Sequence, residues 1–256
     1  MANWPHAPRT PWRQGFPDVI AQAGYREMIS HPAYRDAKDG VSSEAALSLV
    51  ADCISDDSIA DLQRIIGNSK PIVLGIHAEE AVGRNRIPIT YAEVLAGILR
   101  LRTDPGIVQA TVANHTNAPS IYHRFASPPL FAGYVHAGAE YLIVDDTCTA
   151  GGTLTNLKGF VESNGGSVIG MSVLALVQPS RRCEIGLDTV TFKRLKLRHP
   201  ILDRYWREVF GYGTDCLTEG EAGHLLRAPS ADWIRDRLTE ARCDLDLVRD
   251  KAAHGG

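Results

Sequence analysis

The stretch YLIVDDTCTAGGT, residues 141–153, joins a short apolar run to two aspartates and then to a loop of small residues. The apolar part is typical of a strand that is buried on both faces of a parallel sheet. The part rich in hydroxyl groups and glycine is typical of a turn between a strand and a helix. The stretch therefore predicts a strand that ends on Asp145 and Asp146, a tight loop, and a helix that begins near Thr153.

The flanking sequence repeats this alternation of strand and helix. Short β-branched runs bounded by glycine or polar residues indicate strands, and apolar residues at helical spacing indicate the helices between them. This alternation predicts an α/β fold with a doubly wound, mostly parallel sheet. We expect strands at 71–78, 106–113, 141–145 and 167–177, and helices at 42–54 (capped by Ser42 or Ser43), 59–66, 90–102 and 151–163.

The two ends of the chain read differently from its middle. The first thirty residues are rich in Pro, Arg and Trp without periodicity, which indicates an arm or a loop. After Arg181 the sequence is charged and helical, with no further strand pattern. We therefore expect an α/β core over 71–180, a helical C-terminal lobe over 181–256, and an N-terminal arm with helices over 1–70 that forms part of that lobe.

Composition restricts the class of protein. The chain has 256 residues, a net charge of -3 and an apolar fraction of 44%, so no broad basic field favours nucleic acid as a partner. No apolar run approaches the roughly 20 residues of a membrane span, and the N-terminus lacks the apolar centre of a signal peptide, so we expect a cytoplasmic protein that binds no membrane. Five single cysteines predict reduced thiols rather than disulfides or a zinc site. A homodimer is left open.

The composition of the loop after the aspartates predicts an anion-binding site. Thr149, Ala150, Gly151, Gly152 and Thr153 are small enough for the backbone to surround a phosphate. Their amide groups, the two threonine hydroxyls and the positive end of the following helix would donate to it.

The two aspartates would repel a phosphate and need a different ligand. Carboxylates accept hydrogen bonds from neighbouring sugar hydroxyls, and they are also hard ligands for Mg²⁺. Asp145 and Asp146 are therefore candidates for binding a ribose diol, a magnesium ion or both. The alternative is that they only end a strand and cap a turn, as aspartates often do.

With these parts in place, VDDTCTAGGT resembles the phosphoribosyl pyrophosphate (PRPP) signature of type I phosphoribosyltransferases. The segments GRNRIPITYAE, VDDTCTAGGTL and LTEGEAGHLL are also similar to phosphoribosyltransferase-like proteins of bacterial mobile elements. The resemblance covers roughly residues 70–180 and implies that the family's core fold is present. It places the 5-phosphate on residues 149–153, and the ribose and Mg²⁺ on Asp145 and Asp146. A P-loop or a dinucleotide fingerprint fits the sequence less well, because neither GxxxxGK[ST] nor GxGxxG follows a strand.

The resemblance also implies a pyrophosphate loop after the first core strand. By chain order this loop is HAEEAVGRNRIP, residues 77–88. Guanidinium groups pair well with phosphate oxygens, whereas carboxylates would need a cation between them and an anion. The candidates for pyrophosphate binding are Ala78, Glu79, Glu80, Arg84 and Arg86.

A third element of the family is a long loop that closes over the site. Residues 113–135 are the only long, proline-containing connection in the expected core, and we interpret them as this lid. Arg124 is the first candidate for a ligand contact, before Tyr122, His115 and His123. The residues of HPAYRDAKDG, including His31, Lys38 and Asp39, are interpreted as ordinary helix-entry residues.

The resemblance implies transfer of ribose 5-phosphate from PRPP to a nitrogenous base or related acceptor, with Asp145, Asp146, Thr149 and Arg124 as the catalytic candidates. Two positions depart from the family. Thr149 stands where an acidic residue often handles the acceptor's proton, and Ala150 replaces a threonine donor to the phosphate. Two alternatives therefore remain: a regulator that binds PRPP or a nucleotide without turnover, and a hydrolase that uses water as the acceptor. The acceptor itself is not specified by the sequence.

Overall fold

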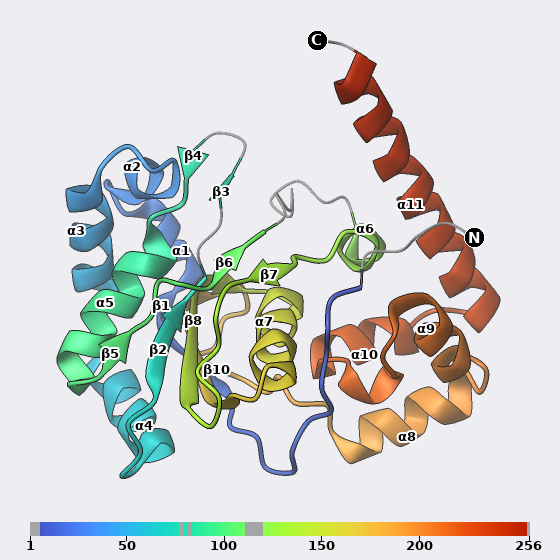
Figure 1. The fold of residues 1–256 in the computed structure, drawn as a ribbon, viewed down its shortest axis with the longest axis horizontal. Coiled ribbons are helices and arrows are strands. Elements are labelled where there is room, and N and C mark those ends of the chain that lie inside the picture. Colours follow the sequence, from blue (N-terminus) through green and yellow to red (C-terminus); the bar gives the residue numbers. More distant parts are fainter. Residues whose placement is uncertain (1–5, 77–78, 81–82, 111–119, 255–256) are drawn as a thin grey trace.

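A six-stranded sheet forms the centre of the computed structural model, which describes residues 6–76, 79–80, 83–110 and 120–254 (Figure 1). The strand order is β10-β1-β9-β8-β2-β5, and every neighbouring pair is parallel except β10 with β1. The strands are β1 Val19–Gly24, β2 Ile72–Gly75, β5 Arg102–Thr103, β8 Glu140–Cys148, β9 Ser167–Leu176 and β10 Arg182–Cys183. Two short two-stranded sheets lie outside the main sheet: β3 Glu79–Glu80 with β4 Gly83–Arg84, and β6 Val108–Gln109 with β7 Phe131–Ala132.

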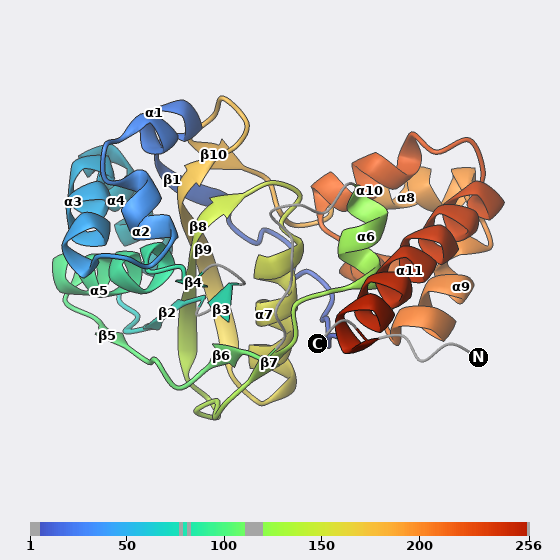
Figure 2. The ribbon, with the colours of Figure 1, turned by 90° about the horizontal axis from the view of Figure 1, so that it is seen from above.

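Helices cover both faces of this sheet, as a doubly wound α/β fold requires (Figures 1 and 2). One face carries α1 Tyr25–Ser30, α2 Tyr34–Lys38, α3 Ser43–Cys53, α4 Asp56–Ile66 and α5 Ile87–Leu99, and the other carries α7 Gly152–Ser163. A separate group of helices beyond α7 forms the lobe: α6 Ile121–Ala126, α8 Thr189–Arg198, α9 Leu202–Phe210, the 3₁₀ turn η2 Thr214–Cys216, α10 Glu219–Leu226 and α11 Ala231–His254.

The alternation of side chains along β8 explains why helices pack on both faces. Leu142 and Val144 belong to the apolar cluster under α3 to α5, whereas Tyr141 and Ile143 belong to the cluster under α7. All four side chains are fully buried. An apolar run of this kind is stable only when both faces of the strand are covered. The predicted fold class is therefore confirmed, and the lobe is helical as expected.

The N-terminal segment differs from its prediction. Residues 19–24 are a strand of the central sheet, not an arm, and α1 to α4 pack on the sheet although the boundary at residue 70 assigns them to the lobe. The strand is short and interrupted by Gln22, which made it hard to recognise. Gln22 is buried because its amide donates to the Tyr91 hydroxyl and accepts from the Ser55 backbone.

Two other strand predictions also need correction. Of the strand expected at 106–113, the described part is strand only at Val108–Gln109, and it pairs with β7 instead of joining the main sheet. Val108 is exposed, so it lacks the burial that a central strand needs. The short β10 lies after Arg181, where no strand is expected. Among the described helices, none combines the length and apolar character needed to cross a membrane.

An N-terminal strap, residues 6–16, runs from the lobe along α7 to the sheet (Figure 1). Its backbone lies directly on Gly159 of α7, where an added Cβ would sit 2.0 Å from the Pro8 carbonyl oxygen. Only glycine permits this approach. The indole of Trp12 donates to the Leu217 carbonyl at 2.6 Å, and Arg13 donates to the Ile169 carbonyl at 3.1 Å. The strap therefore ties the lobe to the α/β core.

Candidate functional site

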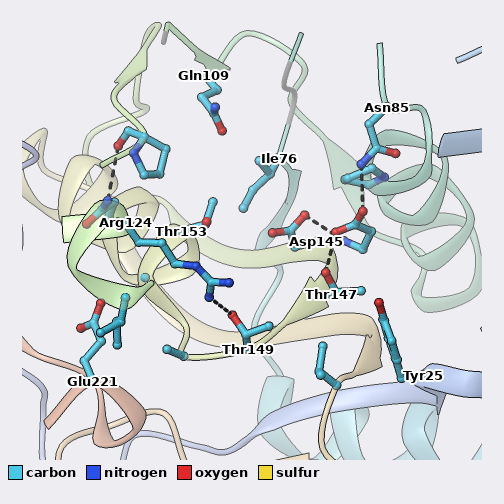
Figure 3. Close-up of a pocket in the computed structure, with 18 of the residues that line it drawn as sticks. Tyr25, Ile76, Asn85, Gln109, Arg124, Asp145, Thr147, Thr149, Thr153 and Glu221 are labelled. Carbon is cyan, nitrogen blue, oxygen red and sulfur yellow. Dashed lines mark hydrogen bonds between the residues drawn. The ribbon is translucent and has the colours of Figure 1, made fainter. Parts of the chain in front are cut away.

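A cavity of about 360 Å³ opens beside the carboxyl ends of β2 and β8, between the sheet and the lobe (Figure 3). Ligands of open α/β folds bind at this edge of the sheet. Segments that lie far apart in the sequence contribute to its walls. The lining residues used below are Arg9, Lys38, Asn85, Arg124, Asp145, Asp146, Thr149, Ala150, Gly152, Thr153, Asn156 and Glu221.

Asp145 and Asp146 lie within β8, which continues past them to Cys148 instead of ending there. On one side β8 stays paired with β9, since Asp145 is in register with Val173. On the other side β2 ends at Gly75, opposite Val144, so the two aspartates lie just beyond it. Both carboxylates are buried and line the cavity. The alternative that they only end a strand and cap a turn therefore does not fit their position.

The carboxylate of Asp146 is surrounded by hydrogen-bond donors. Its Oδ2 accepts from Lys38 Nζ at 2.8 Å and from Asn85 Nδ2 at 2.9 Å, and its Oδ1 accepts from the Thr147 hydroxyl at 3.1 Å. Asp145 accepts from the backbone amide of Asp146 at 2.8 Å. Among the described residues, a cation is therefore hydrogen-bonded to Asp146, and none is hydrogen-bonded to Asp145.

This asymmetry separates the pKa values of the two aspartates. Burial raises the pKa of the Asp145 carboxyl well above its ordinary value, and the adjacent charge of Asp146 raises it further. Burial alone would also raise the pKa of Asp146, but the Lys38 ammonium and the neighbouring donors hold it below its ordinary value. Two carboxyls with opposite shifts can act differently toward one ligand, one as an anion and one as a proton carrier.

The small-residue loop sits at the N-terminus of α7, which begins at Gly152, one residue before the expected start. Gly151 is the cap residue, with φ of 79°, and a Cβ there would lie 2.9 Å from Ile185. Gly151 has no side chain that could cap the helix, and the first amide groups of a helix have no partner within it. Gly152 and Thr153 line the cavity, so the loop can present the donors that a phosphate requires.

Arg124 reaches from α6 to the same loop. Its Nη1 donates to the Thr149 hydroxyl at 2.8 Å, as Figure 3 shows. A second cavity, of about 770 Å³, lies on the lobe side and shares Ile121, Arg124, Thr149 and Ala150 with the first. The hydrogen bond between Arg124 and Thr149 therefore lies where the two cavities meet.

An ion pair between Arg9 and Glu221 also lines the first cavity. Arg9 donates to both oxygens of Glu221, at 2.7 and 3.0 Å, and to Asn156 of α7 at 2.6 Å. Burial alone would lower the pKa of the guanidinium, but the charge of Glu221 raises it above its ordinary value. Glu221 also accepts from the backbone of Thr218, so the strap, α7 and α10 meet at this pair.

The α10 helix is attached directly to the small-residue loop. The Thr218 hydroxyl caps α10 and donates to the Ala150 carbonyl at 2.5 Å. Gly220 lies so close to Ala150 that an added Cβ would be 3.3 Å from its Cα. Ala150, which lacks the hydroxyl of the family's threonine, therefore contacts the lobe.

The pyrophosphate candidates are only partly described. Ala78 and the side chains of Glu79, Glu80 and Arg84 lie outside the described residues. Arg86 does not line the cavity, because its Nε donates to the Gly40 carbonyl at 2.9 Å and its Nη1 to the Ser43 hydroxyl at 2.9 Å. In this conformation Arg86 ties α2 and α3 together and is not brought to the site.

The expected lid contains a packed helix. Tyr122 is buried in the lobe, and His123 lies between the Ser120 hydroxyl at 2.8 Å and Asp244 at 3.2 Å. Of the lid candidates within the described residues, Arg124 lines the cavity, and His115 lies outside them. Apolar residues of α6 that face α11 explain this packing.

Sequence reasoning missed several cavity residues. Lys38 donates a hydrogen bond to Asp146, although the sequence around it is typical of an ordinary helix entry. Arg9 belongs to the Pro- and Arg-rich start, and Glu221 to the charged lobe sequence. Asn85 stands between the two arginines that attracted attention in GRNRIP. No local sequence pattern indicates these residues, because each lies far along the chain from the side chain that it contacts in the cavity.

The aspartates fit a directly bound divalent cation poorly. Mg²⁺ prefers an octahedral shell of oxygen ligands. Here one oxygen of Asp146 already accepts from an ammonium group and an amide. Within the described ranges, no three His, Cys, Asp or Glu side chains gather into a potential metal site. No chemical step is therefore assigned to a metal on these carboxylates.

Comparison with known proteins finds related sequences in Escherichia coli and Haemophilus influenzae. The chain is 42% identical over 243 residues to Protein TraN of Escherichia coli, covering 94% of this chain and 53% of TraN. It is 41% identical over 153 residues to an uncharacterized protein of Haemophilus influenzae, covering 60% of this chain and 34% of that protein. The chain thus spans about half of the first relative and a third of the second. No family model matches the sequence.

Similar solved structures include phosphoribosyltransferases. An adenine phosphoribosyltransferase aligns with a TM-score of 0.34 at 15% identity, over 54% of this chain and 72% of its own. UMP synthase of Leishmania donovani aligns with a TM-score of 0.33 at 14% identity, over 80% of this chain and 35% of its own. Scores this low carry no argument about activity, so the α/β assignment rests on the sheet and helices described above.

Proposed function

We propose that the chain is a phosphoribosyltransferase that transfers ribose 5-phosphate from PRPP to a nitrogenous base or related acceptor and releases pyrophosphate. The observation that carries the proposal is one cavity lined both by the acidic pair, Asp145 and Asp146, and by the small-residue loop that precedes α7. A phosphate site and a diol site side by side fit a ribose 5-phosphate. Neither feature alone would specify that ligand.

In this proposal the amides of Gly152 and Thr153 hold the 5-phosphate at the start of α7. Asp145 and Asp146 accept hydrogen bonds from the ribose hydroxyls. The reaction breaks the bond between C1 and the pyrophosphate oxygen, which keeps the electron pair, and forms a bond from C1 to the acceptor nitrogen. The guanidinium of Arg124 lines the same cavity and would stabilise the negative charge that develops on the leaving pyrophosphate.

The proton of the acceptor decides which acceptors suit the site. Thr149 cannot act as the base, since its hydroxyl accepts from Arg124, and Glu221 is held by Arg9. Among the described residues, these two hydrogen bonds leave neither group available for proton removal. In this proposal Asp145 and Asp146 are engaged by the ribose hydroxyls, and an acceptor nitrogen that carries no proton needs no base. We therefore expect such acceptors to react best.

PRPP binding tests the proposal. We expect isothermal titration calorimetry to show binding to the wild type and at least an approximately hundredfold loss in Asp145→Asn with Asp146→Asn, because two diol acceptors are lost. The matched control is Asp56→Asn with Asp57→Asn, an exposed adjacent pair outside the cavity. Wild-type affinity in the cavity variant would refute the proposal. Pyrophosphate release measured over a panel of bases then identifies the acceptor.

A second candidate is a regulator that binds PRPP without turnover. It is favoured by the hydrogen bond between Thr218 and Ala150, which links the proposed phosphate loop to the lobe. Hydrogen exchange distinguishes the two functions. A regulator would show PRPP-dependent protection of α10 and no pyrophosphate release with any base. Release without a base would instead indicate hydrolysis.

A further inference from the structure

The acidic pair, Asp145 and Asp146, is accompanied by a cation whose role rests on the proposed binding of ribose 5-phosphate. A carboxylate as buried as that of Asp146 needs a compensating positive charge or several donors. The chain provides both. Lys38 Nζ lies 2.8 Å from Asp146 Oδ2, and the two side chains are 20% and 10% exposed.

The position of Lys38 is fixed by the backbone around it. Lys38 is the last residue of α2, and the preceding Ala37 is fully buried. The Ala37 carbonyl accepts from the Arg86 amide at 3.2 Å, and the Gly40 carbonyl accepts from the Arg86 guanidinium at 2.9 Å. Arg86 therefore holds the end of α2 against the segment that also supplies Asn85. Lys38 and Asn85, the two donors to Asp146 Oδ2, are therefore held together as one structural unit.

A divalent cation on the same oxygen would compete with this unit. The ammonium is already within hydrogen-bond distance of Asp146, and two cations so close would repel each other strongly in a partly buried site. The charge of the Lys38 ammonium therefore already balances that of Asp146 at this oxygen. Lys38 also lines the cavity.

We propose that Lys38 is the resident counter-ion of the acidic pair, so that Asp145 and Asp146 bind a ribose 5-phosphate without a divalent cation. The site then needs no metal to hold the diol. Lys38 neutralises Asp146, and Asp146 and Asp145 remain hydrogen-bond acceptors for neighbouring hydroxyls. The proposal concerns only the diol site; it says nothing of a cation that the pyrophosphate group of PRPP would carry in solution.

Ribose 5-phosphate is the suitable probe, because it has the diol and the phosphate but no pyrophosphate to chelate a metal. Its affinity is measured by calorimetry in EDTA and in excess Mg²⁺. For the wild type we expect the two affinities to agree within about twofold. For Lys38→Met we expect binding about tenfold weaker in EDTA, because a charge-assisted hydrogen bond is lost. Mg²⁺ should restore that binding, since Asp146 then has an unmatched charge.

The controls separate charge from shape and from folding. Lys38→Arg keeps the cation and should bind in EDTA, whereas Lys38→Gln keeps a donor without the charge and replaces the Met variant if that variant does not fold. Lys193→Met removes an exposed lysine outside the cavity and should change nothing.

The outcomes are distinct. Wild-type binding that requires Mg²⁺ would overturn the inference and leave the proposed function standing. Unchanged binding of Lys38→Met in EDTA would also overturn it. Absence of ribose 5-phosphate and PRPP binding to the wild type in either buffer would refute the proposed function itself, and the inference with it.

Discussion

Two ion pairs line the cavity, and they differ in burial and in geometry. Arg9 and Glu221 are each 3% exposed and share two hydrogen bonds. Lys38 and Asp146 are 20% and 10% exposed and share one. The planar fork of arginine fixes the orientation of a carboxylate, whereas the ammonium of lysine can change partners with little rearrangement. The first pair is suited to holding the structure together, and the second to meeting a ligand.

The largest expected effect is the loss of the buried pair. Arg9→Met leaves Glu221 buried without a positive partner, which typically costs about 3–5 kcal/mol of unfolding free energy. Lys38→Met is the matched change in the other pair. Because Asp146 keeps its donors from Asn85 and Thr147, we expect a loss of only about 1–2 kcal/mol. Urea unfolding followed by circular dichroism measures both.

A double variant sharpens this comparison. Arg9→Met with Glu221→Met removes both charges, so no isolated carboxylate remains buried, and part of the lost stability should return. Equal losses for Arg9→Met and Lys38→Met would show that the two pairs do not differ in the way proposed. A double variant less stable than Arg9→Met alone would point instead to the hydrogen bond that Glu221 accepts from the Thr218 amide at the start of α10.

The next effect concerns the strap that carries Arg9. Gly159→Ala places a Cβ against the backbone of Pro8 and should cost about 1–3 kcal/mol, as overpacking usually does. The control is Gly97→Ala in α5, where nothing lies within 4 Å of the added atom. Alanine is preferred over glycine in a helix, so the control should gain about 0.5–1 kcal/mol. A loss in both variants would mean that the strap contact is not the cause.

These pairs also show which parts of the molecule the sequence can predict. The apolar run before Asp145 and the small residues after it belong to one continuous stretch, so their strand, loop and helix could be predicted from local pattern. Lys38 and Asp146 are 108 positions apart, and Arg9 and Glu221 are 212. No local periodicity reports such contacts, because they depend on how the elements pack.

Local pattern also misled where a polar residue is satisfied in the core. Gln22 interrupts β1 and hides it, yet its amide finds partners on Tyr91 and Ser55. Residue type makes Arg86 a candidate for pyrophosphate binding, but nearby acceptors on Gly40 and Ser43 hold it. Residue type predicts what a side chain can bind, whereas the packing decides what it does bind.

The mildest test concerns Asp145, the carboxyl of the acidic pair to which no cation among the described residues is hydrogen-bonded. Its folded pKa is raised by burial and by the charge of Asp146, so the folded state binds the proton more tightly than the unfolded state, whose pKa is about 3.9. The stabilising contribution of this group is therefore full below about pH 4, and it is lost as pH rises toward the folded pKa. Asp145→Asn has no such titration.

Wild-type stability relative to Asp145→Asn should consequently fall as pH rises from about 4, and the variant should be the more stable protein at neutral pH. Asparagine has nearly the same shape and can still accept from the Asp146 amide, so no partner is left unpaired. Urea unfolding of both proteins at several pH values measures the difference. Asp146→Asn is the opposite control, because the lowered pKa of Asp146 supplies stability that is present at neutral pH and lost on acidification. A constant difference between wild type and Asp145→Asn would show that Asp145 is not destabilised by its surroundings, and that the two carboxyls do not differ in protonation.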